Sequence, residues 1–86
     1  MAHEQGETHK DRLHIFVNRR KFEEGDGVKP KMTGAEIAAL VNVQADIAVI
    51  RWDSGPDKGN EVPASDTVDL TMGDHFLVTR RVVEGG

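Results

Sequence analysis

The 86 residues include no cysteine. A disulfide scaffold, a cysteine-ligated metal site and a thiol nucleophile are therefore excluded for this chain. The sequence also lacks an apolar run of roughly 18 residues, the length that a membrane-spanning helix needs. Its first residues, Met1 to Gln5, lack the basic region followed by an apolar one that marks a secretory signal. We expect a cytoplasmic protein with no membrane partner.

An excess of positive charge is missing as well. The chain has 15 acidic and 11 basic residues and a net charge of -4, whereas nucleic-acid-binding domains are basic, with clustered lysine and arginine. The nearest approach to such a cluster, Arg19-Arg20-Lys21, is short and falls at an expected turn. We interpret it as a solvated hairpin tip and expect no nucleic-acid partner.

Recognisable catalytic machinery is also lacking. The sequence has no phosphate-binding loop and no metal-ligand spacing, and no nucleophile or orienting carboxylate is recognisable beside His75. We therefore expect no enzymatic activity, no catalytic residue, no metal and no bound cofactor. The length suits one small domain with a single modest core.

The first ordered segment is predicted to be a hairpin. Residues 1–12 hold no large apolar residue after Met1, and we interpret them as a flexible N-terminal arm. Leu13-His14-Ile15-Phe16-Val17 alternates apolar residues on one face and predicts a strand. Asn18-Arg19 predicts a tight turn, after which Lys21-Phe22-Glu23 returns with Phe22 facing the core.

A helix is predicted after this hairpin. Thr33 followed three residues later by Glu36 forms a capping box, in which each residue satisfies a backbone amide of the other. Asn42 can adopt the left-handed backbone angles that end a helix. The spacing predicts two to three turns, and three apolar residues share one face: Ile37, Leu40 and Val41.

The remainder of the chain predicts further strands. Ile47–Trp52 is apolar on both faces, which suits either a central strand or an outer face that binds a partner or a second copy. Residues 53–66 read as a long loop. Thr67–Leu70 and His75–Arg80 predict strands, and Phe76 and Val78 in the second are expected to point inward.

The expected order is strand, strand, helix, strand, strand, strand. It predicts an α+β fold in which a mixed sheet of about four to five strands packs on one helix. The last strand leads into a stretch that ends on Gly85-Gly86. Because glycine has no Cβ atom, paired terminal glycines pass through a channel that is too narrow for other residues, and they leave the terminal carboxylate unhindered.

Three segments, combined with this ending, resemble the bacterial ubiquitin-like proteins of the multiubiquitin family over residues 13 to 86. The segments are Val17-Asn18 before the turn, Thr33-Gly34-Ala35-Glu36-Ile37 at the helix start, and the stretch from Asp69 to Phe76. The resemblance implies a β-grasp fold with the first and last strands adjacent in the sheet centre. It divides the chain into an arm (1–12), a ubiquitin-like domain (13–82) and a flexible tail (83–86).

The resemblance also implies that the protein is a modifier that becomes attached to other proteins. Several proteins of this family are linked to antiphage defence. A partner activating enzyme would adenylate the Gly86 carboxylate with ATP, and a conjugating enzyme would receive it as a thioester. A target amine, usually of lysine, would then attack, and a metalloprotease would reverse the modification. Gly85 and Gly86 are the expected conjugation residues, and Val82, Val83 and Glu84 are expected to determine tail recognition.

Ubiquitin-like folds commonly bind partners through the exposed sheet face near the last strands. The candidate residues for such a face here are Phe16, Ile50, Leu77, Arg80 and Arg81. Two other functions remain open: a sulfur carrier that forms a C-terminal thiocarboxylate, and a non-covalent binding or assembly module. The sequence names neither the target proteins nor the linkage residue.

Overall fold

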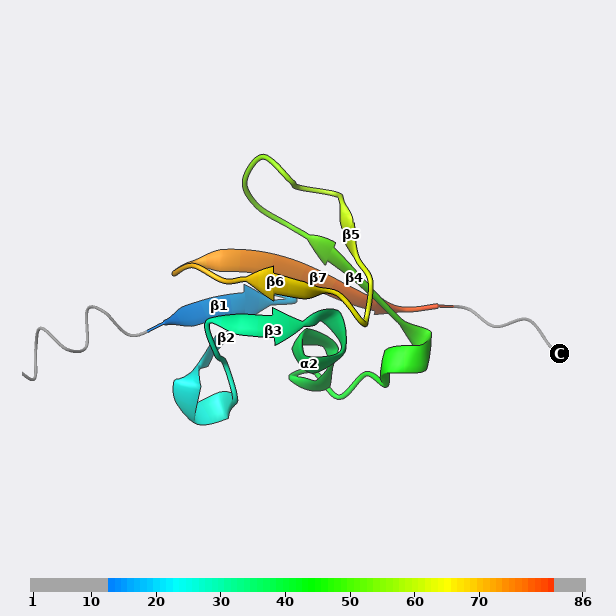
Figure 1. Ribbon diagram of the computed structural model, residues 1–86, viewed down its shortest axis with the longest axis horizontal. Coiled ribbons are helices and arrows are strands. Elements are labelled where there is room, and N and C mark those ends of the chain that lie inside the picture. The colour runs from blue at the N-terminus through cyan, green and yellow to red at the C-terminus, as the bar shows by residue number, and fades with distance from the viewer. Residues whose placement is uncertain (1–12, 82–86) are drawn as a thin grey trace, which may run out of the picture.

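The computed structural model describes residues 13–81, in which seven strands pair into two sheets around one α-helix (Figure 1). Two short 3-10 helices, η1 and η2, connect them. The elements are, in chain order, β1 His14–Val17, β2 Arg20–Glu23, η1 Glu24–Asp26, β3 Lys31–Thr33, α2 Gly34–Ala39, η2 Ala45–Ile47, β4 Ala48–Trp52, β5 Glu61–Val62, β6 Thr67–Asp69 and β7 Asp74–Arg80.

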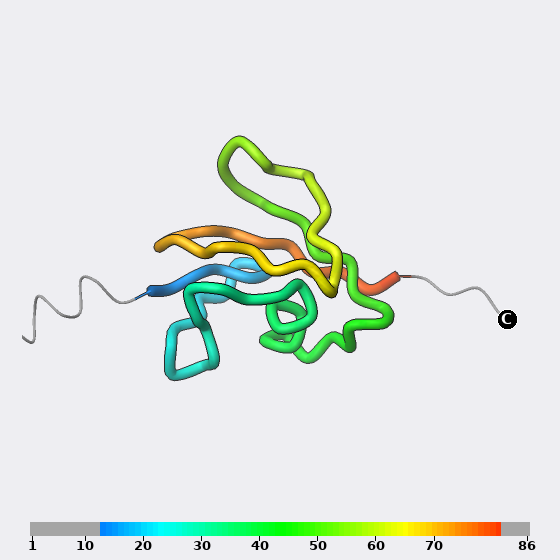
Figure 2. The backbone as a smooth tube through the Cα atoms, in the orientation of Figure 1, coloured from blue at the N-terminus to red at the C-terminus, as the bar shows by residue number. Residues whose placement is uncertain are grey.

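The larger sheet is mixed and has the strand order β2-β1-β7-β4-β5. Its first and last strands in the chain, β1 and β7, run parallel at its centre, and every other pair in it is antiparallel. The backbone trace in Figure 2 shows these two strands side by side although they lie at opposite ends of the described chain. The predicted α+β class, a mixed sheet with one helix, is confirmed.

The hairpin between β1 and β2 turns at Asn18 and Arg19, as predicted. Both residues have positive φ angles, 54° and 70°, which is the geometry of the two-residue turn that matches the twist of the flanking strands. The Asn18 side chain also holds the turn against β7. Its Nδ2 donates to the Val78 carbonyl (3.0 Å), and the Val78 N–H donates to its Oδ1 (2.7 Å).

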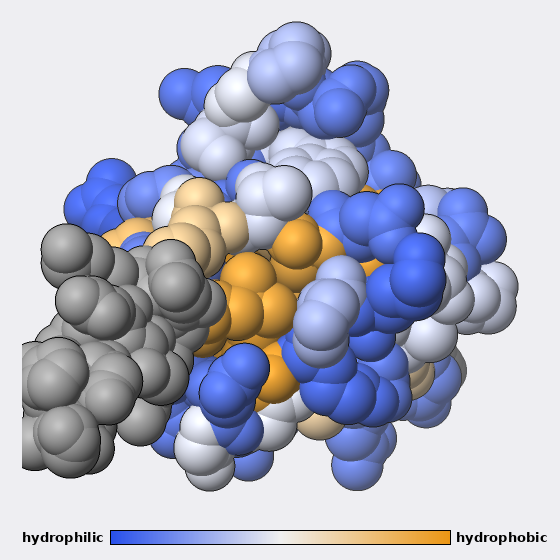
Figure 3. All heavy atoms as spheres, turned by 60° about the vertical axis from the view of Figure 1, so that its left-hand side comes forward, coloured by the Kyte–Doolittle hydropathy of each residue, from blue (hydrophilic) through white to orange (hydrophobic). Residues whose placement is uncertain are grey.

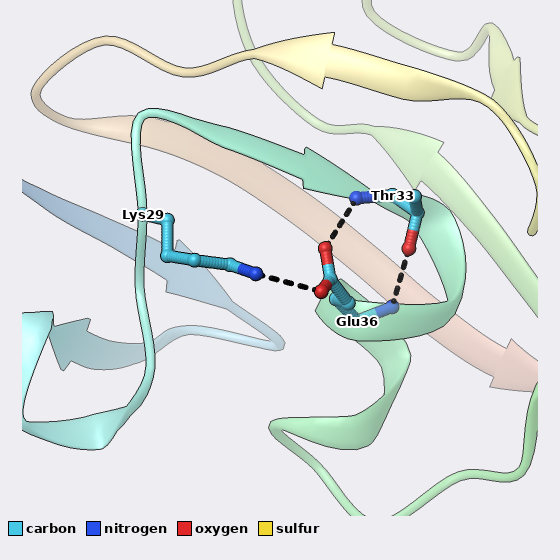
Figure 4. Close-up of polar contacts among 3 residues, drawn as sticks. All are labelled: Lys29, Thr33 and Glu36. Atoms are coloured by element: carbon cyan, nitrogen blue, oxygen red, sulfur yellow. Dashed lines mark hydrogen bonds and ion pairs between the residues drawn. The ribbon is translucent and has the colours of Figure 1, made fainter.

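The capping box at the start of α2 forms as predicted (Figure 4). The Thr33 hydroxyl accepts from the Glu36 N–H (3.1 Å), and Glu36 Oε1 accepts from the Thr33 N–H (2.9 Å). Lys29 Nζ donates to the second Glu36 oxygen at 2.7 Å. These bonds, that from Lys29 first, lower the pKa of the Glu36 carboxyl below its ordinary value.

The helix is shorter than predicted, since α2 has six residues. Tight turns follow it and end at Asn42, whose φ of 62° is the expected left-handed conformation. A segment this short is unstable alone and depends on packing against the sheet. Its buried residues Ile37 and Ala38 belong to the core under the large sheet.

The core lies between α2 and the inner face of the large sheet, which is the face that packs on the helix. Strand alternation directs Phe22, Phe76 and Val78 into it, as predicted, with 7%, 1% and 4% of their surface exposed. The other buried hydrophobic residues are Ile15, Val17, Val28, Met32, Ile37, Ala38, Val43, Ala48, Ile50, Val62 and Leu70.

Two short strands were not predicted. β5 lies in the segment interpreted as the loop 53–66 and pairs with β4, and β3 precedes the helix and pairs with β6 in the small sheet. Two or three residues show no measurable periodicity, so only their pairing partners reveal them. Within residues 13–81, no helix is long and apolar enough to cross a membrane.

Candidate functional site

The predicted conjugation and recognition residues lie outside the described residues. This holds for Val82, Val83, Glu84, Gly85 and Gly86, and also for the arm at 1–12. The structure does describe the strand that leads to them and the sheet face beside it. The end of β7 and the sheet face beside it are therefore the candidate site.

The end of β7 is held on both sides. β7 lies between β1 and β4, and the Asn18 side chain binds both backbone polar groups of Val78. Beyond the strand, the Arg81 N–H donates to the Ile47 carbonyl at 2.6 Å. The chain therefore has a fixed backbone position up to Arg81, at the edge of the molecule shown in Figure 1.

The outer face of the large sheet, opposite α2, carries a small aromatic cluster. Phe16 stacks on His75 with ring centroids 4.5 Å apart and planes at 16°, and His14 meets Phe16 edge-on at 5.7 Å. Leu77 follows His75 on the same face and is 41% exposed. Phe16 and Leu77 thus belong to one face, as predicted.

His75 was missed as a member of this face. Its pairing partner across the parallel strands is Phe16, and the contact between the rings follows from that register. The available signal was the alternation of β7, because residues at positions i and i+2 of a strand lie on one face. That signal placed His75 with Leu77 but could not name Phe16 as its neighbour.

The prediction for Ile50 is wrong. Ile50 is 1% exposed and points into the core, so it cannot be part of an exposed partner surface. It pairs with Val78, which also points inward. The segment Ile47–Trp52 is apolar on both faces, so its sequence did not indicate which residues face outward. In the structure, Val49 and Arg51 face outward.

Arg80 and Arg81 are both exposed, as expected of a partner surface. They lie at the end of β7 rather than within the aromatic cluster. By the alternation of β7, Arg80 lies on the same face as Phe76 and Val78, opposite to the face of Leu77. Arg80 is nevertheless exposed because it lies beyond the core. The predicted surface is therefore divided between the aromatic cluster on the outer face of the large sheet and the two arginines at the end of β7.

Apolar atoms also reach the surface at the other end of the molecule. Figure 3, turned toward the end where β1 begins, shows apolar residues in the middle and hydrophilic residues around them. Met72, in the turn between β6 and β7, is 45% exposed. This end therefore carries an apolar patch with a hydrophilic rim, whereas the end of β7 carries Arg80 and Arg81.

A hollow of about 330 Å³ lies between η1 and α2. Met32 and Leu40 contribute apolar lining, and Asp26, Lys29 and Glu36 contribute the charged groups. Asp26 Oδ2 accepts from the Glu23 N–H, Lys29 is paired with Glu36, and the Glu36 oxygens are already used in the capping box and the ion pair. Among residues 13–81, no group of three or more side chains could hold a metal ion.

No protein-family model matches the chain, and neither a curated protein nor a solved structure matches it. A function is therefore inferred from the order of the strands, from the fixed end of β7 and from the residues that follow it.

Proposed function

We propose that this protein is a ubiquitin-like modifier with a β-grasp fold, joined to other proteins through the carboxylate of Gly86. One observation carries the proposal. β7, which is paired in parallel with β1 at the centre of the sheet, leads the chain out of the sheet beside η2, and Gly85-Gly86 follows in the sequence. The strand order and the single helix on one face support the β-grasp assignment.

Five residues, from Val82 to Gly86, follow Arg81, whose N–H donates to the Ile47 carbonyl. When fully extended, five residues span about 17 Å. The terminal carboxylate then reaches into a narrow channel of a partner enzyme while the folded part stays outside, with Val82, Val83 and Glu84 contacting the channel walls.

The chemistry requires activation, because a carboxylate is a poor acyl donor. The Gly86 carboxylate attacks the α-phosphate of ATP on the activating enzyme and releases pyrophosphate. A cysteine thiolate of that enzyme then displaces AMP to form a thioester, which passes to a conjugating enzyme. A lysine amine of the target attacks the thioester, and the thiolate leaves as an isopeptide bond forms. A metalloprotease hydrolyses that bond.

All catalytic groups in this scheme belong to the partners. This chain, which has no cysteine, provides the reacting carboxylate and a backbone without side chains around it. Gly85 is the position at which a side chain would meet the channel wall. Substitution of Gly85 and deletion of Gly86 therefore address the proposal directly.

A thioester assay tests the proposal. The chain is mixed with ATP and the activating enzyme encoded nearest to its gene, and the products are separated on non-reducing and reducing gels. We expect a thiol-sensitive adduct that disappears when Gly86 is deleted. Gly85→Ala should slow adduct formation roughly 10- to 100-fold, because a small displacement of the reacting group has an effect of that size.

Gly25→Ala is the matched control. A Cβ atom at Gly25 would meet no atom within 4 Å, so this variant should form the adduct at the wild-type rate. The modifier proposal would be contradicted if the wild type formed no adduct with an enzyme that is shown to be active on another substrate. Intact mass then separates the two alternatives, because a sulfur carrier exchanges one oxygen for sulfur and a binding module stays unchanged.

A further inference from the structure

Two arginine pairs that are far apart in the sequence lie at the same end of the sheet. The hydrogen bonds between Asn18 and Val78, which are 60 residues apart, place the β1–β2 turn against the second half of β7. Arg19 follows Asn18 directly, and Arg80 follows Val78 by two residues. We call the four exposed residues Arg19, Arg20, Arg80 and Arg81 the basic end.

Charge is distributed unevenly along the sheet. β1 pairs with Glu23 at its start and with Arg20 at its end. β7 begins at Asp74 and ends at Arg80. The basic end thus belongs to a chain whose net charge is -4. Asp46 in η2 directly precedes Ile47, whose carbonyl accepts from the Arg81 N–H.

The guanidinium groups of the basic end form no ion pair with any other residue among 13–81; the three ion pairs found there all involve lysines. Arg20 lies over the Phe22 ring at 5.3 Å, which orients its guanidinium without neutralising it. Arginine presents a planar set of donors that matches carboxylates in particular.

We infer that the basic end docks on an acidic surface of the activating enzyme while the tail lies in that enzyme's channel. This inference rests on the proposed function. Any protein that receives residues 82–86 must approach the end of β7, where Arg80 and Arg81 lie. Complementary charge at such a rim accelerates the encounter and sets the orientation of the two proteins.

A nucleic acid fits this surface less well. Nucleic-acid-binding domains carry a net positive charge and an extended basic stripe along one face. Here the four arginines of the basic end lie at one end of the sheet, and Glu23 and Asp74 lie at the far end of the same strands. A compact acidic protein surface is the partner that matches this distribution.

The test measures kcat/KM for thioester formation as the concentration of the chain is varied. Arg19→Glu and Arg80→Glu are compared with Lys58→Glu, an exposed residue in the loop between β4 and β5 that undergoes the same change of charge. Each arginine reversal should lower kcat/KM roughly fivefold through KM, and added salt should reduce the difference. Lys58→Glu should match the wild type, and Arg80→Lys should retain most of its rate.

The outcomes for the two proposals are distinguishable. If the wild type forms the adduct and the arginine variants form it at the wild-type kcat/KM, the docking inference is overturned and the modifier proposal stands. If the wild type forms no adduct, the modifier proposal fails, and the surface is tested with a fluorescent oligoglutamate peptide and a fluorescent single-stranded DNA.

In that second assay, peptide binding that the arginine reversals weaken and Lys58→Glu does not supports an acidic protein partner. Preferential binding of the DNA overturns it in favour of a nucleic-acid surface, and binding of neither probe overturns it outright. Circular dichroism of each variant confirms that the fold is retained, as expected for exposed substitutions.

Discussion

Gly34, the first residue of α2, allows the segment between β5 and β6 to lie directly against the start of the helix. A Cβ atom on this residue would lie 2.5 Å from the Pro63 carbonyl oxygen. The Gly34 N–H donates to the Asp66 carbonyl (3.1 Å), and the Ala35 N–H donates to the Ala64 carbonyl (2.9 Å). Backbone carbonyls therefore satisfy helix amides that the capping box leaves free.

Gly34→Ala should reduce the free energy of unfolding by about 1–3 kcal/mol, because two backbone segments must separate to admit one methyl group. Urea denaturation measures the change. Gly25→Ala, which adds its methyl group in open space, should stay within about 0.5 kcal/mol of the wild type. Equal unfolding midpoints for the two variants would show that the segment at Pro63 moves aside freely.

At the scale of the element, side-chain hydrogen bonds stabilise the start of the short helix α2. Thr33 and Glu36 satisfy each other's amides, and Lys29 joins Glu36 from the segment before β3 (Figure 4). The hydrogen bond from Lys29 is the first cause of the lowered pKa of Glu36, and that from the Thr33 backbone is the second. Both favour the ionised carboxylate in the folded state.

This lowered pKa predicts a pH dependence with a defined sign. A folded-state pKa below the ordinary 4.5 of glutamate contributes stability that is complete above that value and is lost as pH falls through the folded pKa. Glu36→Gln removes the charge but keeps an acceptor for Thr33. The wild type should therefore be more stable than Glu36→Gln at pH 7, and the difference should shrink below about pH 4.5.

Urea midpoints measured from pH 3 to pH 7 provide this comparison. Glu61→Gln, in β5, serves as a control because Glu61 is exposed and caps no helix. A difference between the wild type and Glu36→Gln that stays constant across the whole range would contradict the electrostatic explanation.

At the scale of the whole molecule, stability should be greatest where the two ends of the described chain meet. β1 and β7 are central and paired on both sides, whereas β5 has two residues and lies at an edge. Central strands in a small domain usually open only on global unfolding, and edges open locally. Hydrogen exchange followed by NMR should therefore find the slowest amides in β1 and β7.

Amides of β5 and of residues 53–60 should exchange faster by at least tenfold, because local opening exposes them without unfolding the core. Their exchange should depend weakly on added urea, and that of β7 should depend on it as strongly as global unfolding does. Exchange in β7 as rapid as in β5 would contradict this hierarchy.

Local signals in the sequence were sufficient for several elements. The turn at Asn18, the box of Thr33 and Glu36, and the inward direction of Phe76 and Val78 all follow from free energies that act within a few residues. The proposal that Gly85 and Gly86 are the conjugation residues likewise rests on the sequence alone. These features require no knowledge of which strand pairs with which.

Only the tertiary structure decided the features that depend on pairing. Ile50 faces the core because its strand is paired in register with Val78, and His75 joins Phe16 because β1 and β7 run parallel. The strands β3 and β5 exist through their partners. The basic end forms because Asn18 holds the turn to Val78, and this long-range contact brings together arginines that no local pattern connects.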